Sequence, residues 1–453
     1  MCGIIGIFNH SEAAKLATLG LFAEQHRGQE SCGMAVNDGV TIKLRKKMGL
    51  VKEVFRPEKI KELKGKIAIG HVRYPTRGAS SEYNSQPHIV ETLSGPSYAL
   101  TSNGDIINYN EIRSELEKEG VYFASTNDGE LILKFIVYHV EKKGESIIDA
   151  IKIMMKTVKG AYSTVLSTKD SLFMFRDPYA FRPMSYGKTK ENSVVVASES
   201  SALDILYMDW VKEVLPAEII KVDDSGIQSN KNDPLQFRET DTEKHCIFEH
   251  IYFSRPDSFI FGENVFEVRK KIGSLLAEND PITPDVVVPV PDSANFIALG
   301  YARQKNIPFE FGLIRNHYVG RTFIKPEQTI RDESVYQKFN PLPNFFKGKI
   351  VSLVDDSIVR GTTLRKIVKL IRNSGAKEIH LRIGSPPVKH SCFYGIDTPT
   401  REELIANNKS TDEIRQYIGA DSLSYLALDQ LEKAVQEPQN FCYACFDGKY
   451  PVK

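Results

Sequence analysis

The stretch that decides the fold of the second half of this chain is Val351-Ser-Leu-Val-Asp-Asp-Ser-Ile-Val-Arg-Gly-Thr-Thr363. An apolar strand runs here into two adjacent carboxylates, Asp355 and Asp356. A short loop then leads through Gly361 to two threonines that open a helix. The free N–H groups of a helix N-terminus attract anions, and threonine hydroxyls add further donors. The stretch therefore predicts a phosphate-binding loop whose carboxylates bind ribose hydroxyls or a magnesium ion.

Helices and strands alternate on both sides of this loop. We expect helices over 265–279, 295–304 and 362–373, and strands over 286–290, 350–354 and 378–383. Such alternation is typical of βαβ units and a parallel sheet. Residues 245–453 are therefore predicted to form an α/β domain, in which Ser293 follows a second strand end of the same kind as Asp355.

Residues 2–230 show a different rhythm, in which short strands cluster and helices are few. The expected strands are 2–8, 67–72, 98–101, 162–167, 172–175 and 194–198, and the expected helices are 12–25, 130–140 and 147–158. This pattern predicts a layered α+β domain. The segment 223–244 is polar and has no apolar period, so we interpret it as a surface connection between the two domains.

The composition excludes several classes of protein. The 453 residues carry 59 basic and 58 acidic side chains, a formal net charge of +1, which argues against a general nucleic-acid binder. No apolar run approaches the roughly 18 residues that cross a bilayer. The N-terminus lacks the pattern of a secretion signal, and six cysteines in a chain of this length do not suggest a disulfide framework. We therefore expect a cytoplasmic protein with no membrane and no nucleic-acid partner.

Cys2 directly follows the initiator Met. Because cysteine is small, we expect Met1 to be removed, which leaves Cys2 with both a nucleophilic sulfur and a free α-amine. The pKa of an α-amine, about 7.7 to 8.0, suits a general base. A single residue can thus supply both the nucleophile and the base of an amide-cleaving site.

Four further residues suit the same chemistry. Arg73 ends an expected strand and can bind a carboxylate, and Asp128 stands at a helix start where it can bind an ammonium group. Asn103 and Gly104 supply a side-chain amide and a backbone N–H, the two donor types of an oxyanion hole. Together these residues can recognise an α-amino acid and stabilise attack on its side-chain amide.

The cysteines of the second half form another candidate site, made of Cys246, Cys392, Cys442 and Cys445. The last two form a Cys-x-x-Cys pair, which lets two sulfurs approach one metal centre. Four cysteine ligands suit either tetrahedral zinc or a [4Fe–4S] cluster, and the spacing alone does not choose between them.

Three stretches resemble a known family: Met1-Cys-Gly-Ile-Ile-Gly-Ile-Phe8, Gln25-His-Arg-Gly-Gln-Glu-Ser31 and His71-Val-Arg-Tyr74. They are similar to the glutamine amidotransferases of the N-terminal-nucleophile (Ntn) type and, more narrowly, to the amidophosphoribosyltransferases. The resemblance runs from Cys2 to near the C-terminus. It implies an Ntn-type glutaminase domain over 2–230, followed by a type I phosphoribosyltransferase domain over 245–453 with the C-terminal tail.

The resemblance also implies a reaction. A pentosyl-transferring glycosyltransferase of this kind converts glutamine, phosphoribosylpyrophosphate (PRPP) and water into 5-phosphoribosylamine, glutamate and pyrophosphate, the first committed step of purine biosynthesis. Cys2 would then be the nucleophile and Asn103 with Gly104 the oxyanion hole. Arg73 and Asp128 would hold the carboxylate and ammonium of glutamine, and ammonia would pass internally to the second site.

In the second domain the resemblance implies two sets of ligands. Ser293, Asp355 and Asp356 would hold magnesium. PRPP would bind the two aspartates together with Ser357, Gly361, Thr362, Thr363, Lys325 and Arg331. The last two residues lie in a segment that corresponds to a lid over the phosphoribosyl substrate.

The four cysteines resemble those of the branch of the family that binds a [4Fe–4S] cluster, which implies a structural cluster in this chain. Family members are usually homotetramers or homodimers inhibited by purine nucleotides, so we expect a homo-oligomer with such inhibitors. Arg77 and Asp105 depart from the family pattern, which has a small residue and an asparagine at these two positions.

Two alternatives remain at this point. Another Ntn amidotransferase, such as a glucosamine-6-phosphate or asparagine synthetase, would share the Cys2 site but would not need the loop from Asp355 to Thr363. A non-catalytic sensor of PRPP or purine nucleotides would need that loop but would have no use for a processed Cys2 with Arg73 and Asp128.

Overall fold

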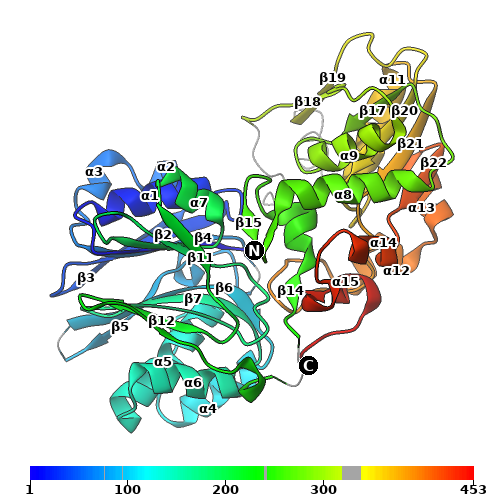
Figure 1. Cartoon of the computed structure of the whole chain (residues 1–453). Helices are drawn as coiled ribbons and strands as arrows, with labels where there is room; N and C mark the ends of the chain where they lie inside the picture. Colours follow the sequence, from blue (N-terminus) through cyan, green and yellow to red (C-terminus); the bar gives the residue numbers. More distant parts are fainter. Residues whose placement is uncertain (76, 94, 239–241, 319–337) are drawn as a thin grey trace.

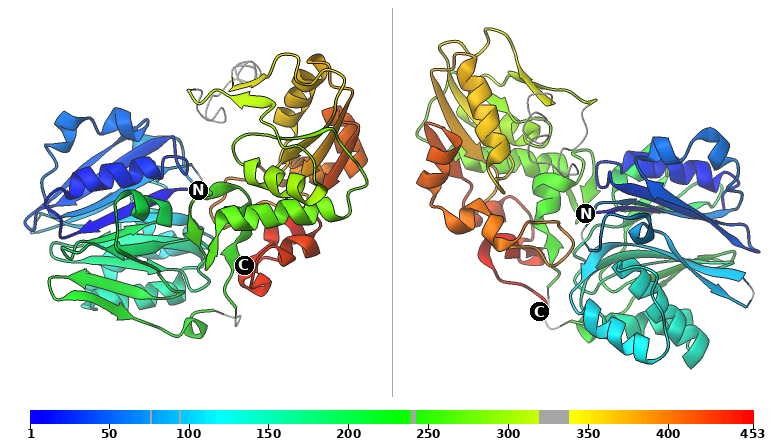
Figure 2. Two further views of the ribbon diagram at one scale, coloured as in Figure 1. Left: turned by 45° about the horizontal axis from the view of Figure 1, so that its top comes forward. Right: turned by 180° about the vertical axis from the view of Figure 1, so that it is seen from behind.

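The computed structural model describes residues 1–75, 77–93, 95–238, 242–318 and 338–453. The chain forms two domains that lie side by side, and both chain termini lie at the junction between them (Figure 1). Figure 2 shows the same division in two further views.

Two antiparallel sheets form the first domain. The strand order of the first sheet is β11 (Trp210–Glu213), β9 (Ser185–Lys188), β10 (Val194–Ala197), β1 (Gly3–Phe8), β4 (Ile67–Arg73), β2 (Ser31–Asn37) and β3 (Ile42–Met48). The order of the second sheet is β13 (Gly226–Asn230), β12 (Ile219–Asp223), β8 (Leu172–Arg176), β7 (Gly160–Ser167), β6 (Gly95–Ile106) and β5 (His88–Thr92).

The two sheets pack face to face, and the alternation of side chains along β1 shows how. Ile4 and Phe8 belong to the apolar core between the sheets, whereas Ile5 and Ile7 belong to the core under the outer helices. Successive side chains of a strand point to opposite faces, so Cys2 lies on the same side as Ile4 and faces the second sheet. The pleat thus directs the candidate nucleophile toward the inside of the sandwich.

Helices cover the outer faces of both sheets (Figure 1). The first sheet carries α1 (Ala13–Ala23), α2 (Val51–Val54), α3 (Pro57–Ile60) and α7 (Ser200–Ile205), and the second carries α4 (Tyr109–Lys118), α5 (Asp128–Lys143) and α6 (Ile147–Thr157). The resulting helix–sheet–sheet–helix arrangement confirms the layered α+β domain that the strand clusters predict.

A parallel sheet forms the centre of the second domain, as the alternating pattern predicts. Its strand order is β17 (Val286–Pro289), β20 (Ile350–Asp355), β21 (Glu378–Ile383) and β22 (Ser422–Tyr425). On the two faces pack α8 (Val265–Glu278) with α9 (Asn295–Lys305), and α11 (Thr362–Asn373) with α13 (Thr411–Ile418). The carboxyl end of β20 therefore carries Asp355, at the edge of the sheet where ligands of such folds bind.

Shorter elements complete the second domain. These are a π-helical turn (Glu249–Phe253), β15 (Phe259–Ile260), β16 (Glu263–Asn264), β18 (Leu313–Arg315), β19 (Phe339–Pro341), α12 (Ile405–Asn408), α14 (Leu428–Lys433) and α15 (Ala444–Asp447). The C-terminal tail returns to the start of the domain, where β14 (His245–Cys246) pairs in parallel with β23 (Phe441–Cys442).

The polar segment 223–244 is only partly a connection, which corrects the interpretation of the sequence. Residues Gly226–Asn230 form β13, which pairs with β12 at the edge of the second sheet of the first domain. An edge strand with one exposed face needs few apolar side chains, so this strand has no apolar signature.

Within the described ranges, no helix is both long enough and apolar enough to cross a membrane.

Candidate active sites

Cys2 and Asn103 meet at the centre of the first domain, although 101 residues separate them. The Cys2 N–H donates a hydrogen bond to Oδ1 of Asn103 over 3.1 Å, and the thiol donates to the carbonyl oxygen of Tyr74 over 3.5 Å. Only 6% of the Cys2 surface is exposed. The sandwich thus encloses the candidate nucleophile beside one of the two predicted oxyanion donors.

The side chain of Asn103 leaves one donor unused. Its Nδ2 is buried and has no hydrogen-bond partner among the described residues. Such a donor costs free energy unless a substrate supplies the acceptor. At the neighbouring Gly104, an added Cβ would lie 1.8 Å from the carbonyl oxygen of Ala161, so only glycine fits. This arrangement suits an oxyanion hole.

Arg73 and Asp128 lie close enough to Cys2 to influence its ionisation. Arg73 ends β4, is buried, and donates to Glu30 over 2.6 Å and to the carbonyl oxygen of Arg77 over 2.8 Å. Asp128 is the first residue of α5 and is also buried. Glu30 could not be recognised from the sequence as a partner of Arg73, because nothing in its local pattern marks it.

Burial dominates the ionisation of these groups. It raises the pKa of the Cys2 thiol, which the amino group of the chain and Arg73 lower and Asp128 raises. The pKa of Asp128 is raised to about 7, mainly by burial and then by Asp105, while Arg77 opposes the rise. A buried thiol with a raised pKa needs a base to remove its proton, which is the role expected of the Cys2 α-amine.

Arg27, for which the sequence indicates no role, joins the Cys2 strand to the second domain. Its Nε donates to the carbonyl oxygen of Cys2 over 2.9 Å. Its terminal nitrogens donate to Glu249 over 2.8 and 3.1 Å and to Glu199. Arg27 and both glutamates are fully buried. No local pattern could have predicted a partner 222 residues away.

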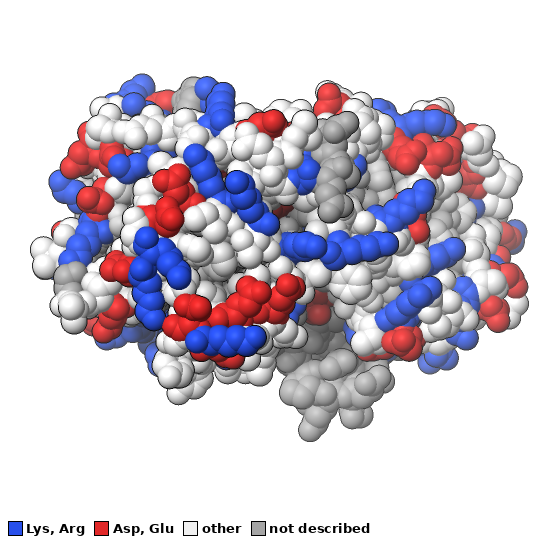
Figure 3. Space-filling view, turned by 90° about the horizontal axis from the view of Figure 1, so that it is seen from below, with Lys and Arg blue, Asp and Glu red and all other residues white. Residues whose placement is uncertain are grey.

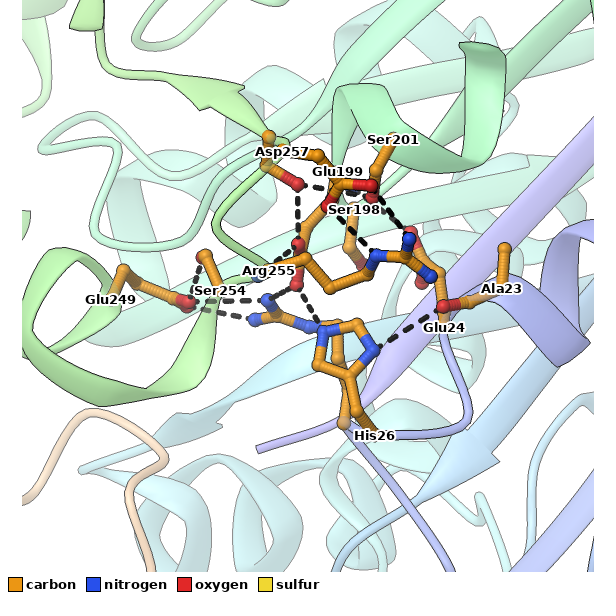
Figure 4. A network of polar contacts seen from close by, with 12 residues as sticks. Ala23, Glu24, His26, Ser198, Glu199, Ser201, Glu249, Ser254, Arg255 and Asp257 are labelled. Atoms are coloured by element: carbon orange, nitrogen blue, oxygen red, sulfur yellow. Dashed lines mark hydrogen bonds and ion pairs between the residues drawn. The ribbon is translucent and has the colours of Figure 1, made fainter. Parts of the chain in front are cut away.

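Glu199 accepts hydrogen bonds from residues of both domains (Figure 4). It accepts from Nε2 of His26 over 2.7 Å, from the hydroxyl of Ser258 over 2.6 Å and from the N–H of Arg255 over 2.8 Å. Burial would raise the pKa of Glu199, but His26 and Arg27 outweigh it and hold the pKa below the ordinary value. Glu199 is therefore an ionised carboxylate at the domain interface.

Glu24 lies beside this network, and its pKa is shifted in the opposite direction from that of Glu199. Its Oε1 accepts from the N–H of Glu199 over 2.9 Å, but its buried Oε2 has no partner among the described residues. Burial, followed by the charge of Glu199, raises the pKa of Glu24 to about 8. The glutamate with few donors is thus protonated near neutral pH, while its neighbour is not.

The predicted phosphate loop follows β20 in the second domain. The N–H of Asp356 donates to Oδ1 of Asp355 over 2.9 Å, and the hydroxyl of Ser357 donates to Asp356 over 2.6 Å. Gly361 adopts a left-handed φ of 72° immediately before α11, which begins at Thr362. The loop therefore ends at the start of α11, where the first N–H groups of the helix are free to bind an anion.

Asp355 and Asp356 lie with Ser293 in a group of oxygen donors that can bind a cation. Burial raises the pKa of both carboxyl groups, and the charge of Asp356 raises that of Asp355 further. The hydroxyl of Ser293 forms a hydrogen bond with Asp356. Adjacent carboxylates and a hydroxyl are the oxygen donors that Mg²⁺ prefers, so the donor set fits this ion. The predicted ligands Lys325 and Arg331 lie outside the described residues.

The four cysteines of the second domain converge from three segments. Cys246 and Cys442 are register partners in the β14–β23 pair. Cys445 has a strongly raised pKa, caused by burial and then by Cys442, Cys246 and Cys392, so all four sulfurs are near neighbours. Within the described residues, no three His, Cys, Asp or Glu side chains are arranged so that they could hold a metal ion. Four converging thiols could serve either a [4Fe–4S] cluster or one tetrahedral zinc, and the contacts do not choose between them.

Arg182 of the first domain lies next to these cysteines. Its Nε donates to the carbonyl oxygen of Tyr394 over 2.8 Å, and its pKa is raised by Cys246 and Cys392 against the opposing effect of burial. Phe181 stacks on Tyr394 with the ring centres 4.2 Å apart. The cysteine segment thus packs against the first domain.

The face of the molecule in Figure 3 carries basic and acidic side chains side by side over both domains. This mixture agrees with the near balance of charge in the sequence. It gives no support to a broad basic surface for nucleic acid on this face.

Two domain families match this chain. The family described as glutamine amidotransferase domain matches residues 71–205, and the family described as phosphoribosyl transferase domain matches residues 262–383. These matches fall in the layered domain and in the parallel-sheet domain respectively, which is the order that the resemblance implies.

Relatives with curated names align with the whole length of this chain. Amidophosphoribosyltransferase 1, chloroplastic, of Arabidopsis thaliana is 47% identical, covering 100% of this chain and 79% of its own length. The amidophosphoribosyltransferase of Methanocaldococcus jannaschii is 45% identical, covering 100% and 98%.

A solved structure matches equally well. The glutamine PRPP amidotransferase of B. subtilis, complexed with ADP and GMP, superposes with a TM-score of 0.90 at 42% identity, covering 100% of this chain and 98% of that chain. The sequence, both domains and the full-length relatives agree, and this chain belongs to the amidophosphoribosyltransferase family.

Proposed function

We propose that this chain transfers ammonia from glutamine to PRPP and so forms 5-phosphoribosylamine, glutamate and pyrophosphate, the first committed step of purine biosynthesis. The observation that carries the proposal is the presence of two complementary sites in one chain. The first is Cys2 beside the unpartnered amide nitrogen of Asn103. The second is the Asp355–Asp356 pair in front of the N-terminus of α11.

In the first half of the reaction, the Cys2 sulfur adds to the amide carbon of glutamine while the α-amine of Cys2, freed by removal of Met1, takes the thiol proton. Asn103 and Gly104 donate hydrogen bonds to the oxygen of the tetrahedral adduct. The C–N bond then breaks, and ammonia leaves with the proton from the same amine. Water hydrolyses the remaining thioester to glutamate and regenerates the thiol.

Arg73 and Asp128 place the glutamine for this attack. The guanidinium of Arg73 binds the α-carboxylate, and the ionised carboxylate of Asp128 binds the α-ammonium group. Both side chains are buried and near Cys2, which supports these roles. Fixing the amino-acid end of the substrate leaves its side-chain amide as the part that meets the sulfur.

In the second half, ammonia attacks C1 of the phosphoribosyl group and the bond to pyrophosphate breaks. Ser357, Gly361, Thr362 and Thr363 bind phosphate through backbone and hydroxyl donors, with Lys325 and Arg331 as added cations. Ser293, Asp355 and Asp356 would hold magnesium, which when bound neutralises the leaving pyrophosphate. Exclusion of water protects C1 from hydrolysis, so we propose that ammonia passes internally between the two sites.

Cys246, Cys392, Cys442 and Cys445 would hold a [4Fe–4S] cluster. These cysteines join the start of the domain, the segment after β21 and the C-terminal tail, so a cluster here stabilises the fold. Cys246 is buried and the other three are partly buried; none of them belongs to the phosphate loop, and we assign them no part in the transfer itself.

Further properties follow from the same family. The B. subtilis enzyme was solved in complex with ADP and GMP. A second solved structure, 42% identical with a TM-score of 0.91, is that of an allosteric regulatory enzyme of purine biosynthesis. We propose that purine nucleotides inhibit this chain, that it acts as a homotetramer or homodimer in the cytoplasm, and that its domains span 2–230 and 245–453.

A product assay tests the proposed function. Purified protein, PRPP and magnesium are combined with either glutamine or ammonia, and 5-phosphoribosylamine, glutamate and pyrophosphate are measured. We expect product from both donors and glutamate only from glutamine. Binding of PRPP without turnover from either donor would instead indicate a sensor.

A further inference from the structure

Arg77 reaches from the segment after β4 to the end of β6. Its Nε donates to Oδ1 of Asp105 over 2.8 Å, and a terminal nitrogen donates to the carbonyl oxygen of Ile106 over 3.0 Å. The guanidinium carbon also lies 4.8 Å from the centre of the Tyr109 ring. Three different contacts therefore hold this side chain in one place.

The backbone around Arg77 orients Arg73. The carbonyl oxygen of Arg77 accepts from the Arg73 guanidinium over 2.8 Å, and that of Ala79 accepts over 3.4 Å. Asn84 fastens the other end of the segment, since it donates to the carbonyl oxygen of Ala79 over 2.9 Å and accepts from the N–H of Thr126 over 3.0 Å. The segment 77–84 thus supplies the acceptors that aim the proposed carboxylate-binding arginine.

Asp105 occupies a sensitive position, because it directly follows Gly104 and acts on Asp128. Its negative charge raises the pKa of Asp128, whereas Arg77 lowers it. An ammonium group binds an ionised carboxylate, so a second carboxylate nearby weakens that site unless a cation balances it. Arg77 is the cation that balances it, and the side chains of the pair are only 30% and 18% exposed.

We propose that Arg77 and Asp105 are a positioning pair for the glutamine pocket: the pair fastens the segment that aims Arg73 and balances the negative charge beside Asp128. Neither residue touches the reacting atoms. The inference rests on the proposed function of the Cys2 pocket and concerns only the affinity for glutamine and its pH dependence.

The sign of the pH effect follows from the groups that act on Asp128. These are Asp105, Arg77, Cys2 and Tyr109. Burial raises the pKa of Asp105 and Arg77 lowers it, as Arg77 does for Asp128. Without the charge of Arg77, the two carboxyl groups therefore become fully ionised only at higher pH. Replacing Asp105 as well removes the repulsion and returns ionisation to lower pH.

The test compares Arg77→Gln, Asp105→Asn and the double variant in the full chain, with glutamine and with ammonia as donors. In Arg77→Gln we expect the KM for glutamine to rise about tenfold, more than kcat falls. The acidic limb of the kcat/KM profile should move about one pH unit upward. The double variant should return the acidic limb to lower pH, because neither charge is left unbalanced, whereas the part of the KM increase that comes from the unfastened segment should remain.

Two controls distinguish a specific effect on the glutamine pocket from the general effect of losing an arginine and from misfolding. Arg415→Gln removes a partly exposed arginine that pairs with Asp412 in the second domain, and should leave the KM for glutamine unchanged. Ammonia-dependent synthesis reports that each variant is folded. An unchanged KM or an unshifted limb in Arg77→Gln would overturn the pair, as would a double variant whose acidic limb stays as high as that of Arg77→Gln. A wild-type protein inactive with both donors would instead remove the proposed function on which the pair rests.

Discussion

Gly395 of the second domain touches the backbone of Gly104, the proposed oxyanion donor of the first. A Cβ added to Gly395 would lie 2.8 Å from the carbonyl carbon and 2.9 Å from the carbonyl oxygen of Gly104, and Gly395 has a φ of 98°. Gly395 also follows Tyr394, whose carbonyl oxygen accepts from Arg182. The second domain thus packs directly against the proposed oxyanion site of the first.

Gly395→Ala should therefore impair glutamine use more than ammonia use. The new methyl group would push the Gly104 backbone, and we expect glutamine-dependent kcat/KM to fall about tenfold or more, as losses of oxyanion donors do. Gly419→Ala is the matched control. Gly419 has a similar φ of 85°, but an added Cβ would meet nothing within 4 Å. Equal effects of the two variants would show that backbone strain alone is responsible.

Cys2→Ala should abolish glutamine-dependent synthesis and leave ammonia-dependent synthesis intact. The substitution removes only the nucleophile for amide cleavage, and the phosphoribosyl site is untouched. Cys32→Ala, at another fully buried cysteine of the same domain, controls for the loss of a thiol from the core. Wild-type rates with glutamine in Cys2→Ala would show that another residue is the nucleophile.

Asp356→Asn should depress synthesis with both donors, because both use the same phosphoribosyl substrate. We expect a loss of about a hundredfold or more in kcat/KM for PRPP if the carboxylate holds the metal. Asp285→Asn, which changes a carboxylate at the opposite end of β20, where Oδ2 accepts from the N–H of Ile350, should have little effect. A variant that kept both activities would remove the basis for the magnesium site.

The cysteine cluster predicts a coloured protein. Anaerobically purified chain should be brown and should contain about four irons per chain. Cys442→Ser should lower the iron content and the thermal stability together, while Cys32→Ser should lower neither iron nor colour. A colourless anaerobic preparation that contains one zinc per chain would replace the cluster with a zinc site.

Glu24→Gln should stabilise the protein, and more so at higher pH. Because the folded state raises the pKa of Glu24 to about 8, the folded chain keeps a proton that the unfolded chain releases. The stability that this proton contributes is complete below the unfolded pKa and is lost as pH rises through the folded one, by at most about 1.4 kcal/mol per pH unit. Gln keeps the acceptor for Glu199 and does not ionise.

Thermal denaturation at about pH 6 and about pH 8 measures this difference, which should be larger at the higher pH. Glu58→Gln, at an exposed position, controls for the removal of one negative charge. A gain in melting temperature that did not depend on pH would mean that Glu24 is not the group that titrates.

Elements with a strong local pattern could be predicted from the sequence. Helix α11 spans Thr362–Asn373 as expected, because Gly361 allows the turn before it and the spaced apolar side chains Leu364, Ile367, Val368 and Ile371 pack on the sheet. The expected first strand begins one residue too early, at Cys2, which lies just outside the β1 strand Gly3–Phe8.

Other elements give no such signal. Strand β2 (Ser31–Asn37) is buried along its whole length, yet it contains Ser, Cys, Gly and Asn, because a strand between two covered faces needs small residues as much as apolar ones. Strand β13 is polar because it is an edge. Neither could have been distinguished from a loop by periodicity.

The candidate sites likewise contain features that the sequence predicts and features that only the folded chain shows. The chemistry of Cys2 and Asp355 could be predicted from short motifs, because nucleophile and phosphate loop are local features. The pairing of Arg77 with Asp105 could not, since each residue is only an isolated departure from the family pattern and the bond between them is a property of the folded chain. The same holds for Arg27 and Glu249.

The Arg27–Glu249 pair has a consequence for the exchange of whole domains by recombination. The chain between the domains is short and polar, so the two halves look like modules that could be joined to other partners. A foreign second domain without an acidic turn at the place of Glu249 would leave Arg27 with Glu199 and the Cys2 carbonyl oxygen as its remaining acceptors. The cost is then lower than that of a buried charge that loses its only partner, about 3–5 kcal/mol. Successful hybrids should therefore be those that inherit the acidic turn together with the strand that carries the nucleophile.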